Sequence, residues 1–141
     1  MMNVKNTNNN VDCNLNKKIN HGIKKARKIR RENDQGHIEY KWKLCDFKND
    51  HNKRMERLAS QLKYRLYEGS GKAVYNLGYS DNGEPAGIPY DMMLRSLQNL
   101  HTICDNIRAI LKTYRVFQGL NGYCANVFIE GTSVFDNDTL F

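Results

Sequence analysis

The chain has 141 residues and a mass of 16.4 kDa, which suits one ordinary domain with a tail and excludes a multi-domain enzyme. Hydrophobic residues make up 40% and charged residues 26%, a mixture that excludes general disorder and allows a packed core without disulfides. No apolar run is long enough to cross a membrane, and residues 1–20 lack the apolar centre of a signal peptide. We therefore expect an intracellular protein with no membrane partner.

The net charge of +7 is concentrated at the beginning of the chain. Residues 1–35 carry nine Lys and Arg against three acids, whereas residues 36–141 carry thirteen against twelve. The pI of about 9.3 therefore describes a basic arm attached to a nearly neutral domain. We divide the chain into a disordered Asn-rich and basic arm (1–35), an α+β domain (36–131) and a C-terminal linker or tail (132–141).

The arm has two parts with different compositions. Residues 1–20 include eight Asn and few large apolar side chains, a composition that predicts disorder. Residues 17–31 hold eight bases and no acid, which fits contact with RNA phosphates, a localisation signal or a solubilising arm. The candidate nucleic-acid-binding residues are Lys17, Lys18, Lys24, Lys25, Arg27, Lys28, Arg30 and Arg31.

The first elements of the domain are predicted from hydrophobic periodicity. Residues 38–44 alternate apolar and charged side chains, which indicates a strand with one buried face. The following segment has apolar residues at helical spacing, with Asn49, Asp50 or Asn52 as the N-cap and Gly69 as the stop. Two glycines in Glu68-Gly-Ser-Gly-Lys72 fit a left-handed turn after this helix better than a phosphate-binding loop.

Patterns in the second half of the chain predict a hairpin, a helix and two more strands. Asp81-Asn82-Gly83 is typical of a tight turn joining strands at 73–79 and 84–88. A helix is expected over residues 90–111, followed by strands at 113–117 and 123–130. The order β-α-β-β-α-β-β predicts a two-layer α+β sandwich, a mixed sheet with both helices on one face.

The sequence contains few motifs that indicate catalysis or metal binding. Cys13, Cys45, Cys104 and Cys124 form no C-x-x-C pair, and Cys104 lies on the apolar stripe of its helix beside His101. We expect no metal site and read Cys104 as part of the core. Tyr75, Tyr79, Trp42 and Phe117 fit core packing or cross-strand pairs, with an aromatic platform for bases as the alternative.

The stretches Gln61–Tyr75, Asp81–Gly83 with Gly87, and Ser96–His101 carry a family resemblance. Residues 37–130 resemble the N-terminal domain of the GTP-binding protein 1 and 2 family, translational GTPases related to elongation factor 1-alpha. In that family the nucleotide-binding motifs lie downstream of this domain, and no G-x-x-x-x-G-K-[ST], D-x-x-G or N-K-x-D occurs in residues 1–141. The resemblance implies a cytoplasmic role in translation or RNA quality control, in contact with ribosomes or RNA. GTP and magnesium are expected only where a downstream GTPase domain exists.

Two principal hypotheses follow for the function. The first is a non-catalytic, monomeric N-terminal module of a GTP-binding-protein-1-like translational GTPase that binds RNA, the ribosome, or a GTPase domain in cis or in trans, and that needs no cofactor in this chain. The alternative is a stand-alone nucleic-acid-binding α+β protein with a basic arm. A small enzyme is a third possibility, which would require GTP turnover that depends on Lys72.

Overall fold

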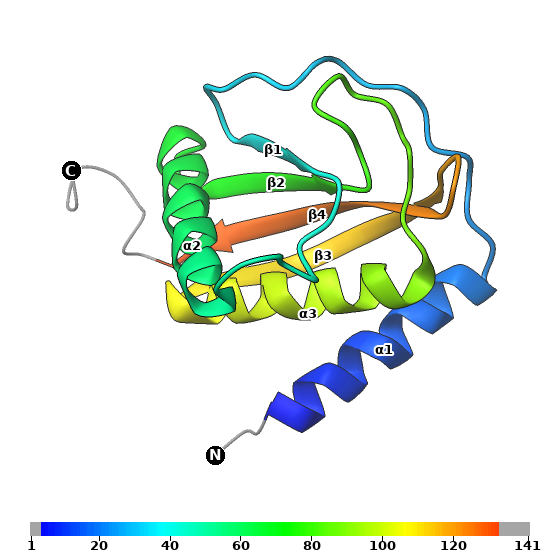
Figure 1. Ribbon diagram of the computed structural model, residues 1–141, viewed down its shortest axis with the longest axis horizontal. Helices are drawn as coiled ribbons and strands as arrows, with labels where there is room; N and C mark the ends of the chain where they lie inside the picture. Colours follow the sequence, from blue (N-terminus) through cyan, green and yellow to red (C-terminus); the bar gives the residue numbers. More distant parts are fainter. Residues whose placement is uncertain (1–3, 133–141) are drawn as a thin grey trace.

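The computed structural model describes residues 4–132, with side chains described from residue 10 onward (Figure 1). Its elements are α1 (Val4–Asn20), β1 (Ile38–Lys41), α2 (His51–Glu68), β2 (Lys72–Leu77), α3 (Tyr90–Asn106), β3 (Ala109–Gln118) and β4 (Tyr123–Gly131). The strands form one sheet in the order β1-β2-β4-β3, in which β1 runs parallel to β2 and the other pairs are antiparallel. This confirms the prediction of an α+β fold with a mixed sheet.

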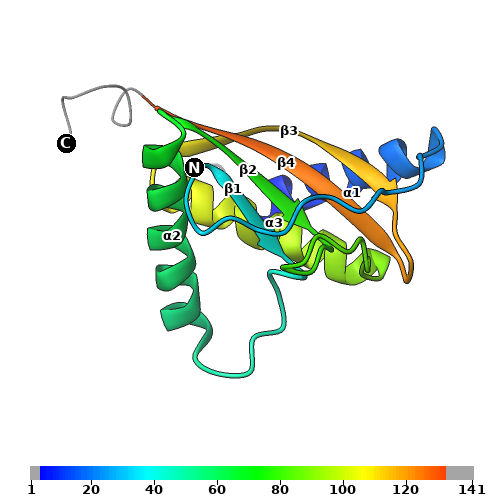
Figure 2. The same ribbon diagram turned by 90° about the horizontal axis from the view of Figure 1, so that it is seen from above.

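Helices α2 and α3 pack against one face of the sheet and against each other (Figures 1 and 2). Alternate residues of β2 and β4, including Tyr75 and Val127, are buried beneath them. The predicted apolar stripe of α3, from Met93 to Cys104, faces this core. Because each helix places one stripe on the sheet, the two-layer packing follows from the periodicity of the sequence.

The ends of α2 follow the local signals in the sequence. Of the three candidate caps, Asp50 is the N-cap, and its carboxylate accepts hydrogen bonds from the backbone amides of Asn52 and Lys53 at 3.0 and 3.3 Å. The helix ends at Glu68, and Ser70 and Gly71 take positive φ angles before β2 begins. The Gly-Ser-Gly segment therefore ends a helix, as predicted.

The prediction of disorder is wrong for residues 4–20, which form α1. Val11, Leu15 and Ile19 lie four residues apart on one side of this helix, and Leu15 is fully buried in the main core. The hydroxyl of Tyr90 also donates a hydrogen bond to the carboxylate of Asp12. Packing against α3 and β3 thus offsets the weak helix propensity of the many asparagines.

The rest of the predicted arm also differs from a free tail. Residues 24–36, named the strap here, run past the 78–88 loop to the start of β1 (Figure 1). Three backbone amides fix it: Ala26 donates to Gln118, Ile29 to Gly83 and Glu32 to Asp81, at 2.8, 2.9 and 2.7 Å. Ala26 and Ile29 also pack against a second cluster formed by Tyr40, Tyr79 and Cys124. These contacts overcome the entropy that composition alone predicted would keep the segment disordered.

The predicted strand at 84–88 is wrong, although the turn before it is present. The amide of Gly83 donates to the carbonyl of Ser80 at 2.9 Å, which closes the turn. Both edges of β2 are already taken, one by β1 and the other by β4, so no edge remains for a hairpin partner. The 84–88 segment instead makes a single bridge from Ile88 to Tyr123.

Several other boundaries differ from the prediction, including the ends of α3 and β1, and β2 ends at Leu77 and not at residue 79. Helix α3 ends at Asn106, not at residue 111, because Arg108 takes a positive φ angle and the chain turns into β3 at Ala109. Ile107 and Leu111 fit the helical stripe, but Ala109 and Leu111 also fit the alternation of a strand, and sheet pairing decides between the two. Strand β1 ends at Lys41, three residues earlier than predicted. The predicted tail at 132–141 lies outside the described residues except for Thr132.

Candidate nucleic-acid interface

The strap presents its bases outward and its small apolar residues inward. Ala26, Ile29 and Glu32 are partly buried, whereas all six of its bases are exposed. These three inward residues are three positions apart, and the two bases that precede each of them face solvent. The exposed bases are Lys24, Lys25, Arg27, Lys28, Arg30 and Arg31.

Most of these charges are free to meet an external anion. Within the part of the chain that the structure describes, Lys28 is the strap base that forms an ion pair, with 3.2 Å between its Nζ and Oε1 of Glu84. Both side chains of that pair are well exposed, so the pair is weak. The strap is therefore a line of positive charge roughly 25 Å long.

Two further candidate bases lie just before the strap, at the end of α1. Lys17 is exposed, and the Nζ of the half-buried Lys18 lies 4.8 Å from the centroid of the Tyr114 ring. A cation over an aromatic face is held by the ring's electron density. The eight predicted bases therefore follow one another along the chain, from the last turn of α1 into the strap, whose backbone is drawn in Figure 1.

A buried cluster of charges anchors the far end of the strap. The guanidinium of Arg65 in α2 lies 2.9 Å from Oε1 of Glu39 and 3.7 Å from Oε2 of Glu32. The same group donates to the carbonyl oxygens of Gly36 and Asn33, at 2.9 and 3.0 Å. One arginine therefore links the helix, β1 and the strap.

Two carboxylates share this guanidinium, and their proximity changes the acidity of one of them. Burial and a side-chain hydrogen bond with Glu39 raise the pKa of Glu32 to about 7, while the backbone amide of Tyr40 acts in the opposite direction. Glu32 Oε2 accepts a hydrogen bond from that amide at 2.6 Å. The anchor of the strap is therefore sensitive to proton concentration near neutrality.

The sheet face opposite α2 and α3 is the second exposed surface beside the strap. Arg115 of β3 lies with its Cζ 5.7 Å from the centroid of the Phe128 ring in β4. On the same face, Asn126 Nδ2 donates to Asn76 Oδ1 at 2.8 Å. These residues are not predictable from the sequence, because their side chains come together only through the register of β2, β4 and β3.

The aromatic platform considered from the sequence does not form. Tyr75 is buried in the main core beneath the helices, and Tyr79 and Phe117 pack in the second cluster under the strap. Trp42 is separate from them and 51% exposed. Core packing is therefore the role of Tyr75, and Phe128 is the aromatic residue with a neighbouring cation on the open face.

The predicted core position of Cys104 is confirmed. Cys104 is buried in the core, and burial raises the pKa of its thiol to about 12. Across residues 4–132 no group of three His, Cys, Asp or Glu side chains is placed to hold a metal ion. No helix in that range is long and apolar enough to cross a membrane.

The chain is similar to GTP-binding protein 2 of Mus musculus and of Homo sapiens, with 40% identity over 84 residues in both comparisons. The match covers 60% of this chain and 14% of each relative, so the chain spans about one seventh of the length of these relatives. None of the protein-family models matches the chain. No solved structure is significantly similar to it. The sequence similarity supports a relation to the GTP-binding proteins, in agreement with the resemblance noted above.

Proposed function

We propose that this chain is a non-catalytic binding module that holds single-stranded RNA, free or on the ribosome, by its phosphates. The observation that carries the proposal is the strap, where five of six outward bases lack an acidic partner among the described residues. Backbone hydrogen bonds hold these bases along one line, so the entropy lost on binding a phosphate chain is smaller than for a free tail. The open sheet face beside the strap offers Phe128 and Arg115 for stacking with bases.

The proposal assigns no reaction to this chain. Residues 1–141 contain no phosphate-binding loop, and Lys72 begins a strand and lies 4.0 Å from Glu130. A lysine in that setting lacks the backbone cradle that holds a nucleotide phosphate. We infer that the module serves a GTP-binding domain in the same chain or in another one, and that any GTP and magnesium bind there.

Replacement of the outward bases tests this function better than removal of residues 1–35, because removal would also destroy the packing of α1 and the strap. The test variant is the triple replacement Lys24→Gln, Lys25→Gln and Arg27→Gln. The matched control replaces three exposed bases on α2, Lys53→Gln, Arg57→Gln and Lys63→Gln. Both variants lose the same charge and keep the core intact.

Binding of a fluorescent 12-nucleotide single-stranded RNA is then measured by anisotropy at physiological salt. We expect the strap variant to bind at least about tenfold more weakly than the parent, and the α2 variant to change by less than about threefold. Equal losses of affinity in the two variants would show that RNA binding depends only on the net charge of the protein, and the proposed interface would be rejected.

A second candidate function is docking of a protein domain, such as a GTPase domain, on the open sheet face. Ile38 and Ile110 on this face are 38% and 51% exposed, and Val74 lies between β1 and β4 on the same face. Exposed apolar side chains of this kind suit a protein partner better than a phosphate chain. Ile110→Ser would weaken protein docking and leave RNA binding unchanged, which separates the two functions.

A further inference from the structure

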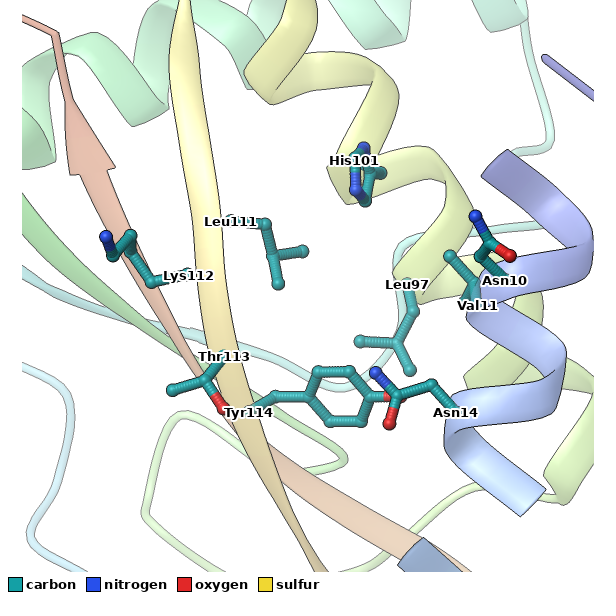
Figure 3. Close-up of a pocket in the computed structure, with 9 residues that line it drawn as sticks. All are labelled: Asn10, Val11, Asn14, Leu97, His101, Leu111, Lys112, Thr113 and Tyr114. Atoms are coloured by element: carbon teal, nitrogen blue, oxygen red, sulfur yellow. The ribbon is translucent and has the colours of Figure 1, made fainter. Parts of the chain in front are cut away.

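A pocket with a volume of about 280 Å³ lies between α1, α3 and β3 (Figure 3). This volume is close to the lower end of the range of small-molecule sites. Figure 3 shows side chains from all three elements around the space. The residues that line it include Asn10, Val11, Asn14, Leu97, His101 and Tyr114.

Two buried polar atoms at this pocket have no hydrogen-bond partner. Tyr114 is 5% exposed, and its hydroxyl is unpaired. The Nδ1 atom of His101 is likewise unpaired, since the nearest carboxylate oxygen, on Asp105, lies 3.9 Å away. Both atoms are almost fully covered, so an occupant reaches either one only when the side chains around it shift; pairing the atom then stabilises the bound state, because an unpaired buried polar group is unfavourable.

The pocket is suited to an uncharged occupant. Burial raises the pKa of Tyr114 to about 12, so its hydroxyl remains a neutral donor and acceptor. Lys112 borders the pocket but points away from it in Figure 3, and its Nζ lies 3.4 Å from Oε2 of Glu130. The other polar groups at the pocket are the side-chain amides of Asn10 and Asn14 and the hydroxyl of Thr113.

This combination matches the chemistry of a nucleobase. A base is uncharged, has donors and acceptors on its edges and apolar faces, and is recognised by asparagine amides. Val11 and Leu97 provide apolar walls for its faces. Since Asn10 and Asn14 are exposed on α1, a base extruded from a bound strand could enter beside that helix.

The pocket also lies close to the basic path. The Nζ of Lys18 is 4.8 Å from the Tyr114 ring centroid, and Gln118, where the strap meets β3, is four residues farther along the strand. Four strand residues span roughly 13 Å. A strand held by Lys18 and the beginning of the strap would therefore pass the mouth of the pocket.

We propose that this pocket receives one unpaired base of the RNA, an inference that rests on the proposed function. The test uses a 12-nucleotide ribose–phosphate strand without bases and four strands that carry one adenine, cytosine, guanine or uracil at the centre. Backbone contacts alone would give all five strands the same affinity. With a base in the pocket, at least one of the single-base strands binds about tenfold more tightly than the strand without bases.

Point variants test whether the higher affinity of a single-base strand arises at the pocket. Tyr114→Phe removes the unpaired hydroxyl, and Asn14→Ala removes one amide; each is expected to reduce the gain to about twofold. Tyr75→Phe is the matched control, because Tyr75 also has a buried, unpaired hydroxyl but does not line the pocket. The control should keep the full gain. Equal binding of all five strands, or a gain that survives both pocket variants, would overturn the inference while leaving backbone binding intact.

Failure of the proposed function gives a different result. If no strand binds, the RNA function is rejected. Binding of free nucleosides to the pocket is then measured at millimolar concentration. Shifts in the ring resonances of Tyr114 and His101 that are absent in the Asn14→Ala protein would support a base site. No shift with any of the four nucleosides would overturn it.

Discussion

Arg65 of α2 and Glu39 of β1 form a buried ion pair, with 2.9 Å between Nε and Oε1 and side-chain exposures of 4% and 3%. The same guanidinium donates to the carbonyl oxygens of Asn33 and Gly36, at the end of the strap. The pair therefore connects the stability of the domain with the position of the basic strap, which is the surface proposed to bind RNA.

Replacement of Arg65 should be strongly destabilising. Arg65→Met leaves the carboxylate of Glu39 buried without its main partner, and we expect the free energy of unfolding to fall by about 3–5 kcal/mol. Urea unfolding followed by circular dichroism measures the change. Arg57→Met, at an exposed position of the same helix, is the control and should cost less than about 0.5 kcal/mol. Similar values for the two variants would contradict the role of the pair.

Stability should decrease as the pH rises towards 7, because of Glu32. Its pKa in the folded protein is about 7, raised from an ordinary value of 4.5, so the folded state binds the proton more tightly than the unfolded state. The resulting stabilisation is fully present below about pH 4.5 and is lost as the pH rises through 7, with a size of roughly 1–3 kcal/mol.

Unfolding in urea at about pH 5 and about pH 8 measures this effect. Glu32→Gln keeps the side chain uncharged throughout, so most of the difference between the two pH values should disappear. Glu56→Gln, an exposed carboxylate replacement on α2, should retain the difference. A parent protein that is more stable at the higher pH would contradict the assignment.

The parts of the fold that could be predicted are those with strong local signals. The N-cap Asp50, the apolar stripe of α2 and the alternation before Glu130 all depend on neighbours within a few residues, and the elements that they indicate are present. Pairing is different, because β2 is flanked by β1 and β4 from distant parts of the chain. No local pattern around Gly83 indicates that both edges of β2 are occupied, so the sequence alone predicts a hairpin there.

The candidate site could be predicted in composition but not in shape. The bases of residues 17–31 are evident from the sequence, whereas disorder was expected because Ala26 and Ile29 are too few to form a core by themselves. Their spacing of three residues, continued by Glu32, was the available signal of an extended segment with one inward side. The cluster against which this segment packs, formed by Tyr40, Tyr79 and Cys124, exists only after the sheet has formed.

The turn at Gly83 should be intolerant of any side chain, because the strap crosses it closely. Gly83 has a φ angle of 87°, and a β-carbon there would lie 2.0 Å from the carbonyl oxygen of Ile29. Gly83→Ala should lower the free energy of unfolding by about 3 kcal/mol, from the backbone conformation and the clash together. Gly22 has a similar φ angle of 90° but no atom within 4 Å of such a β-carbon. Gly22→Ala should therefore cost only about 1 kcal/mol in the same unfolding experiment, and equal costs would show that the crossing is not tight.

Helix α1 should depend on Leu15 for its attachment. Leu15 is fully buried in the main core, so Leu15→Ala should weaken the docking of α1 by about 2–4 kcal/mol. Hydrogen exchange of the α1 amides measures the docking directly and should become faster in this variant. Cys13→Ala changes an exposed position of the same helix and should leave the exchange rates unchanged. Unchanged protection of α1 in the Leu15→Ala protein would show that the helix is held by other contacts.

The salt dependence of RNA binding tests the central claim most directly. If the five unpaired strap bases replace counterions on a single strand, the slope of log K against log salt is about −3.5 for the parent protein. It falls to about −1.4 when Lys24, Lys25 and Arg27 are replaced by Gln, and it stays near −3.5 for the triple variant of Lys53, Arg57 and Lys63. A slope near zero, or a slope that the strap replacements leave unchanged, would contradict the account.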